Sequence, residues 1–163
     1  MKNGKASQWI SIVCAIALLG AVAVAFLPLL QTNTPAGETV YFHGFPIFFG
    51  GKVEQTFPSG LYTFNFETNI PMLVSTQALL LSAVACYLAK QSRINRAISM
   101  LLLTASIVIL CLGRTLVPGT SSLTVDGLEF SYGFYLVLII AIPCFIAEGA
   151  SLFAFQAKKK TEK

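Results

Sequence analysis

Residues 40–51 read VYFHGFPIFFGG, and they follow the first long hydrophobic run of the chain. They belong to a segment, residues 31–69, that holds seven of the 13 Phe of the protein. Both halves of the stretch, 40–43 and 46–49, are rich in aromatic and β-branched side chains, and the glycine pair at its end is a hairpin turn signal. The stretch therefore predicts two strands outside the hydrophobic runs.

The same segment continues with GLYTFNF at residues 60–66. Here Tyr62, Phe64 and Phe66 alternate with polar residues, which is the period-two pattern of a half-buried strand. We expect the three rings to share one face of a small β-sheet, because successive side chains of a strand point to opposite sides.

The composition is that of a membrane protein. Hydrophobic residues make up 55% of the 163 residues, charged residues only 11%, and the mean hydropathy is +0.74. Soluble domains carry about 25% charged residues, so water is the wrong solvent for most of this chain. The basic residues lie beside hydrophobic runs and form no independent basic face, which argues against nucleic acid as a partner. The length is that of one domain.

Four hydrophobic runs are long enough to cross a bilayer, which takes about 20 helical residues. They cover residues 9–30, 70–89, 97–117 and 132–155. A cleavable signal peptide is the alternative for the first run, because Ala23-Val24-Ala25 fits a small-x-small cleavage site. The run is longer than a signal peptide's apolar region of about 7–15 residues, which favours a retained span, but cleavage within residues 1–25 stays open.

The distribution of positive charge predicts how the chain is threaded. If both termini are cytoplasmic, nine of the eleven basic residues lie inside and only Lys52 and Arg114 lie outside. The nine are Lys2, Lys5, Lys90, Arg93, Arg96, Lys158, Lys159, Lys160 and Lys163. We therefore expect a multi-pass protein of the plasma membrane, with residues 31–69 and 118–131 outside the cytoplasm.

The second outer segment also carries a hairpin signal. Asp126-Gly127 is a strong two-residue turn, and pairing across it puts four apolar side chains on one face. These are Leu123, Val125, Leu128 and Phe130. An isolated hairpin is marginally stable, so we expect this face to pack against Tyr62, Phe64 and Phe66 and to form a single extracytoplasmic cap.

Glu148 is the acidic residue that falls inside a hydrophobic run, and a charge at that depth is expensive. Counting the same depth on the neighbouring runs reaches Thr104 and Ser82, so a polar layer of these three residues is possible. One interpretation is a proton- or cation-handling site or a contact with a partner's span. The other is a hydrogen-bonded carboxyl that holds the bundle together, and we favour it because no second titratable group is evident.

No catalytic, metal or cofactor site is predicted. Cys14, Cys86, Cys111 and Cys144 all lie in apolar runs without metal-site or disulfide spacing, as small buried thiols do. His43 has no companions at a recognisable ligand spacing. Nothing in the sequence points to an enzyme.

Four spans, cytoplasmic termini, a long β-rich first outer loop and a shorter second one resemble the claudin and peripheral-myelin-protein type of membrane protein. The resemblance covers the whole chain as topology. Of that family's first-loop signature of Trp, Gly-Leu-Trp and two Cys, only Gly60-Leu61-Tyr62 is similar here, so no functional residues are carried over.

The fold class that we predict is an all-α membrane protein, a four-transmembrane-helix bundle with a small extracytoplasmic β-sheet cap. As function we expect a non-catalytic integral membrane protein whose cap mediates recognition or assembly, for example as an accessory subunit of a membrane complex. Its partners are then the lipid bilayer and either another membrane protein or a second copy of the chain. The alternative is a small transporter or channel component that uses Glu148.

Overall fold

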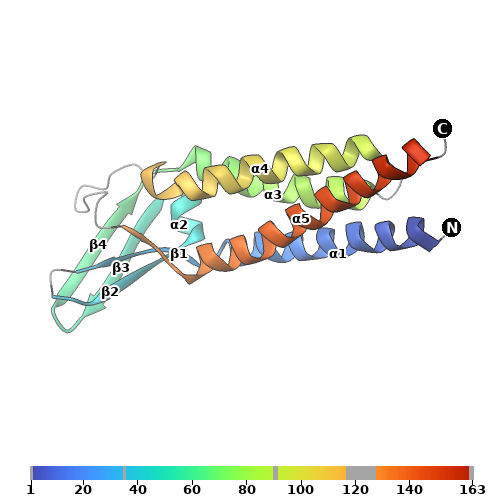
Figure 1. The fold of residues 1–163 in the computed structure, drawn as a ribbon. Coiled ribbons are helices and arrows are strands. Elements are labelled where there is room, and N and C mark those ends of the chain that lie inside the picture. The colour runs from blue at the N-terminus through green and yellow to red at the C-terminus, as the bar shows by residue number, and fades with distance from the viewer. Residues whose placement is uncertain (1, 35, 90–91, 117–127, 162–163) are drawn as a thin grey trace.

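The computed structural model describes residues 2–34, 36–89, 92–116 and 128–161, and this part of the chain is mostly helical with small antiparallel sheets. Its long helices are α1 (Lys2–Val24), α3 (Ile70–Leu88), α4 (Arg93–Leu116) and α5 (Tyr132–Thr161). They lie side by side as a bundle, with the strands at one end and both chain termini at the other (Figure 1).

Three of these helices contain segments that are long and apolar enough to cross a membrane. These are Ile70–Leu88, Arg93–Gly113 and Tyr132–Phe153. In α1 the apolar stretch Gln8–Val24 is shorter. These segments fit a membrane protein, because a helix of about 20 apolar residues matches the hydrocarbon thickness.

The bundle closes as a ring, in which α1 packs against α3 and α5, and α4 packs against the same two helices. On α1 the inward positions follow alternating steps of three and four residues: Ser11, Cys14, Leu18 and Ala21. Large apolar side chains such as Val13 and Ile16 are exposed on its outer side. Apolar residues on both the inner and the outer face are what a lipid solvent allows.

The strands and one short helix, α2 (Gly44–Phe49), make up the cap. One sheet has the order β2-β1-β5, formed by β1 (Pro28–Asn33), β2 (Thr39–His43) and β5 (Glu129–Phe130). The other is the hairpin of β3 (Gly51–Phe57) and β4 (Gly60–Phe66). All pairings are antiparallel.

The predicted alternation in β4 is observed. Phe64 and Phe66 are buried, Tyr62 is half-buried and Asn65 between the two phenylalanines is exposed. The Phe42 ring of β2 contacts both phenylalanines, with centroid distances of 5.0 Å and 4.9 Å. The two sheets are therefore held together by a buried aromatic contact.

The first hydrophobic run does not stay helical to its end. α1 stops at Val24, and Pro28, Leu29 and Leu30, which belong to the predicted span of residues 9–30, lie in β1. The side chains of both leucines are fully buried. Hydropathy counts apolar residues and cannot separate a buried strand from the last turns of a buried helix.

Residues 46–49 are helical, so their assignment to a strand was wrong. They form most of α2, where Ile47 and Phe48 are buried and the rings of Phe45 and Phe49, one turn apart, lie 5.0 Å from each other. A short apolar run of this kind fits either element. The glycine pair is likewise no hairpin turn, because Gly50 ends α2 at a φ of 76° and the chain enters β3.

α2 sits directly on the end of α1 because Gly44 allows a close approach. A Cβ atom at this position would lie 2.0 Å from the backbone oxygen of Ala25. On its other side α2 accepts the backbone N–H of Asn69 at Phe48 O, at 3.3 Å, one residue before α3 begins. The cap is thus joined rigidly to two helices of the bundle.

Candidate functional site

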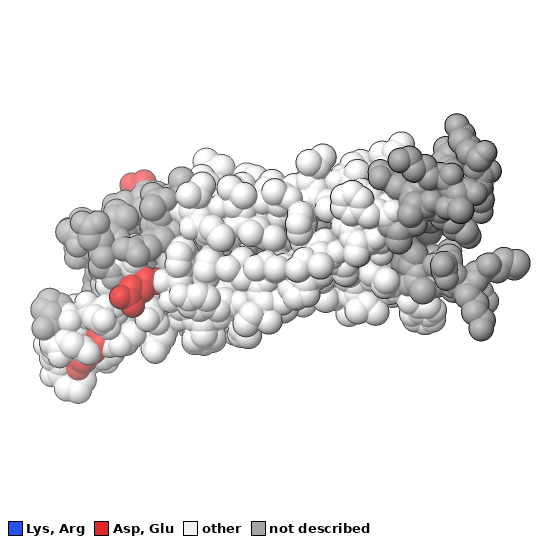
Figure 2. Space-filling view, viewed as in Figure 1, with Lys and Arg blue, Asp and Glu red and all other residues white. Residues whose placement is uncertain are grey.

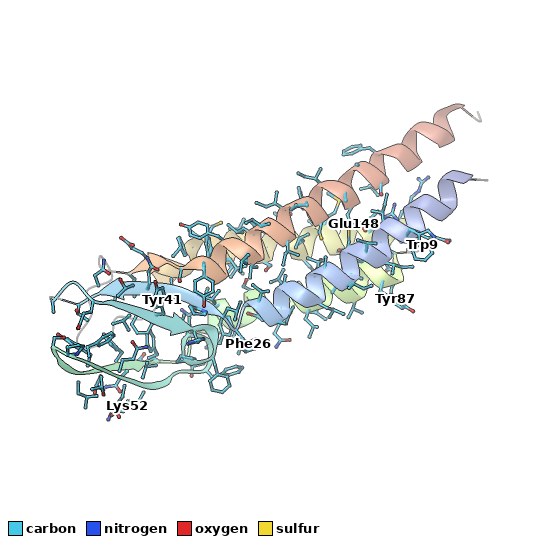
Figure 3. All side chains as sticks on the ribbon, turned by 90° about the horizontal axis from the view of Figure 1, so that it is seen from below. Trp9, Phe26, Tyr41, Lys52, Tyr87 and Glu148 are labelled. Atoms are coloured by element: carbon cyan, nitrogen blue, oxygen red, sulfur yellow. The ribbon has the colours of Figure 1, made fainter. Side chains whose placement is uncertain are left out.

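The polar residue that the sequence singles out, Glu148, is fully buried between the helices of the bundle (Figure 3). Its Oε2 lies 3.0 Å from Nε of Arg96 on α4, whose side chain is also buried. The guanidinium donates a further hydrogen bond from Nη2 to Ser11 Oγ on α1, at 3.1 Å. Ser11, Arg96 and Glu148, which we call the charge cluster, therefore connect three helices.

The energetics of the charge cluster are those of a buried ion pair. Desolvating two charges is costly, and their attraction at 3.0 Å offsets this cost only while both partners are present. Removing one partner of such a pair costs about 3–5 kcal/mol, because the other charge is left buried. The pair thus favours one mutual arrangement of α4 and α5.

Both oxygens of the Glu148 carboxylate are shielded from solvent. The thiol of Cys86 lies within hydrogen-bonding reach of this carboxylate. The thiols of Cys14, Cys86 and Cys144 lie close enough for the carboxylate charge to act on them. All three cysteines are unoxidised and buried.

Ser82, the second member of the predicted polar layer, is buried and pairs with Ser99 of α4. The two hydroxyls lie 2.9 Å apart, and each also donates to the other residue's backbone oxygen, at 3.0 Å and 3.2 Å. Ser75 and Ser106 repeat this arrangement seven residues along each helix, with all three distances at 3.0 Å. These two serine pairs fix the register of α3 against α4.

Thr104, the third member, does not join the layer. It is exposed on the outer side of α4, and its hydroxyl donates to Met100 O of its own helix, at 2.8 Å. Counting residues gives the depth of a side chain in the membrane, but each step also turns the helix by about 100°. Thr104 points outward, whereas Ser99 and Leu103 point inward. It also lies five residues along α4 from Ser99, the residue level with Ser82, so the predicted depth is wrong as well.

Arg96 is the functional residue that sequence reasoning missed. The sequence places it in the basic link before the third hydrophobic run, but α4 begins earlier, at Arg93, and includes it. A signal was present, because Arg96 lies three and seven residues before Ser99 and Leu103 and so shares their face. Glu148 therefore does have a charged partner, although the hydrophobic runs of the sequence indicate none.

The structure describes two of the four residues that the second outer segment is predicted to contribute to the cap interface, Leu128 and Phe130. Leu128 is buried, Glu129 is exposed and Phe130 is half-buried, the alternation expected of this strand. β5 pairs with β1, matching Phe130 with Leu30, so the second outer segment joins the sheet of the first. Leu123 and Val125, with the turn between them and β5, lie outside the described residues.

The faces meet differently from the prediction. Phe64 and Phe66 pack on Phe42 of β2, whereas Phe130 stacks on Phe134 at the start of α5, with ring centroids 3.8 Å apart. Leu128, Phe64 and Phe66 all belong to one continuous apolar core, and Tyr62 packs against it. The aromatic strand and the second outer segment thus share a core through intermediate residues.

The side chains of the described residues form no group of three or more His, Cys, Asp or Glu that could hold a metal ion. Comparison with protein-family models, with curated proteins and with solved structures finds no match.

Proposed function

We propose that the protein is an integral membrane protein with four spans, in which α1 crosses the bilayer beside α3, α4 and α5. The apolar stretch Gln8–Val24 of α1 is at the short end of the roughly 17–25 residues that a membrane span takes. Exposed aromatic residues support this placement: Trp9 and Tyr87 lie toward the end of the bundle away from the cap (Figure 3), and Tyr132 and Tyr135 begin α5 at the cap end. Such side chains favour the two membrane interfaces.

In this proposal the cap faces outward from the plasma membrane and both termini are cytoplasmic. Because Arg96 is buried in the bundle, eight basic residues, one fewer than the nine counted above, remain at the cytoplasmic end, against Lys52 and Arg114 outside. The acidic residues visible in Figure 2 gather at the cap end. The excess of basic residues at the cytoplasmic end agrees with the positive-inside rule, to which acidic residues contribute little.

We propose further that the protein is not a catalyst and that its cap mediates recognition or assembly. The observation that carries this proposal is the pairing of Glu148 with Arg96, which uses the charged groups of the interior to hold helices together. The surface available for a specific role is then the cap. Its tip is braced where Ser59 donates to Glu38 and where Gln55 Nε2 donates to Tyr41 O at 3.3 Å, so it presents a fixed shape.

The test is purification of the full chain in mild detergent, with identification of bound proteins. Leu61→Ser and Tyr41→Ser alter exposed apolar side chains of the cap, and Ile139→Ala alters an exposed side chain of α5 as the matched control. We expect the cap variants to lose the bound protein and the control to retain it. Retention by both cap variants, or loss by the control alone, contradicts a role for the cap.

A small transporter is the second candidate, and the burial of the Glu148 carboxylate within the bundle favours it. Ionisable side chains at membrane depth often mark ion or proton pathways. Reconstituted protein would then show pH-dependent ion flux that Glu148→Gln abolishes. An absence of flux in the wild type, measured in liposomes across pH 5–8, rules this candidate out.

A further inference from the structure

One polar side chain of α3 faces outward at membrane depth. Six of the exposed positions of this helix follow alternating steps of four and three residues, and we call them the α3 seam: Ile70, Val74, Gln77, Leu81, Val84 and Leu88. Pro71, Leu80 and Tyr87 are exposed beside it. Five of the seam residues are aliphatic, and Gln77 near the middle is not. It lies seven residues into the helix, about 10 Å from its outer end, too deep for its short side chain to reach water.

Gln77 differs from the other hydroxyl and amide side chains between Pro71 and Cys86. Ser75 and Ser82 are engaged by serines of α4, and Thr76 donates to Met72 O at 3.1 Å. None of the hydrogen bonds among the described residues involves the amide of Gln77. An amide without a partner in hydrocarbon is costly, so a hydrogen-bonding group from outside the bundle is favoured at this position.

From this geometry we propose that the α3 seam binds the α3 seam of a second copy of the chain, with the two Gln77 amides hydrogen-bonded at its centre. All copies insert in the same direction, so two copies are related by a two-fold axis along the membrane normal. Such an axis brings each seam residue opposite itself. An amide carries both a donor and an acceptor, so it is complementary to a second amide in a way that a lone donor or acceptor is not.

The spacing of the α3 seam also supports a second copy of the chain as its partner. A repeat of seven residues keeps one stripe of each helix facing its partner, as in left-handed helix pairs. Polar side chains hydrogen-bonded across helices drive such association in membranes, where aliphatic contacts alone give little preference over lipid. The proposal rests on α3 crossing the bilayer and does not depend on what the cap recognises.

The test uses the full-length protein in liposomes, with separate pools carrying a donor or an acceptor fluorophore at the C-terminus. Gln77→Leu should weaken self-association roughly tenfold at unchanged thermal stability, because the side chain makes no contact that the monomer needs. Gln77→Asn keeps the amide and should retain part of the association. Thr104→Leu is the matched control: by the register of the serine pairs it lies at the same depth on α4, it is exposed, and its hydroxyl is already bonded to its own helix.

A crosslinking experiment tests the face itself, in a background where the exposed Cys111 is replaced by serine. A cysteine at Val84, one heptad from Gln77, should form an intermolecular disulfide on oxidation, and one at Ile139 on α5 should not. The proposal is overturned if the wild type stays monomeric at every protein-to-lipid ratio, as it would if a different protein covers the seam. It is equally overturned if Gln77→Leu associates as strongly as wild type, or loses stability along with association.

Discussion

The bundle and the cap bury different kinds of side chain. Between the helices of the bundle lie the charge cluster and two serine pairs, set among small and aliphatic residues. The interior of the cap is aromatic, with Phe42 against Phe64 and Phe66 and with Phe48 against Phe26 at 5.7 Å. Fully buried polar side chains concentrate in the helices, and fully buried rings concentrate in the cap.

The difference follows from the solvent on each side. In water, burying a phenylalanine removes a large apolar surface and stabilises the fold, so the cap is held by rings. In lipid the surroundings are as apolar as the side chains, so apolar burial favours association only weakly and polar contacts select the packing. We therefore expect the stability of the bundle to fall most when its buried polar side chains are removed. The stability of the cap should fall most when its buried apolar side chains are truncated.

The largest effect is expected at the charge cluster. Glu148→Leu leaves the Arg96 guanidinium buried without its counter-charge and should lower the free energy of unfolding by about 3–5 kcal/mol. The double variant Arg96→Leu/Glu148→Leu removes both charges and should recover most of that loss. Thermal unfolding in detergent measures both. If the double variant is as unstable as the single one, the pair is not what orders these helices.

A smaller effect is expected in the cap. Leu128→Ala removes buried side-chain volume from the second outer segment and should cost about 2–3 kcal/mol. Because β5 pairs with β1, the loss should reach the first outer segment and expose residues 51–66 to protease. Glu129→Ala, on the exposed side of the same strand, is the control. Unchanged proteolysis in the Leu128 variant indicates that the two segments fold independently.

The smallest effect is expected at the serine pairs. Ser82→Ala removes one hydroxyl from a contact that Ser99 shares with Cys86, and the cost should be about 0.5–1.5 kcal/mol. Thr104→Ala should change stability by less than about 0.5 kcal/mol, since Thr104 is exposed and bonded to its own helix. Equal losses in the two variants indicate that a hydroxyl bonded to a neighbouring helix contributes no more than one bonded to its own helix.

Much of the bundle is predictable from the sequence, because hydrophobic length fixes where helices lie. The sequence placed the three candidate spans to within a few residues, and the alternation of Tyr62, Phe64 and Phe66 correctly predicted β4. Asn69 caps α3 by accepting the backbone N–H of Met72 at its Oδ1, at 3.1 Å.

The errors arise where two physical causes produce the same pattern. The apolar stretch 46–49 predicts a strand where α2 forms, and the apolar residues 28–30 predict a longer membrane span where β1 begins. Both stretches are too short for their hydrophobic periodicity to separate a helix from a strand. Arg96 was assigned to the link because a charge at the edge of a hydrophobic run usually marks its end. Only the facing helix, which brings Glu148 within 3.0 Å, makes its burial favourable.

The account depends most on the outward position of the cap, and labelling with a membrane-impermeant thiol reagent on intact cells tests it directly. In a background with Cys111 replaced by serine, a cysteine at exposed Ser59 between β3 and β4 should react, and one at Ser92 before α4 should react only after the cells are permeabilised. Labelling at position 92 but not at position 59 on intact cells would place the cap in the cytoplasm and contradict the account.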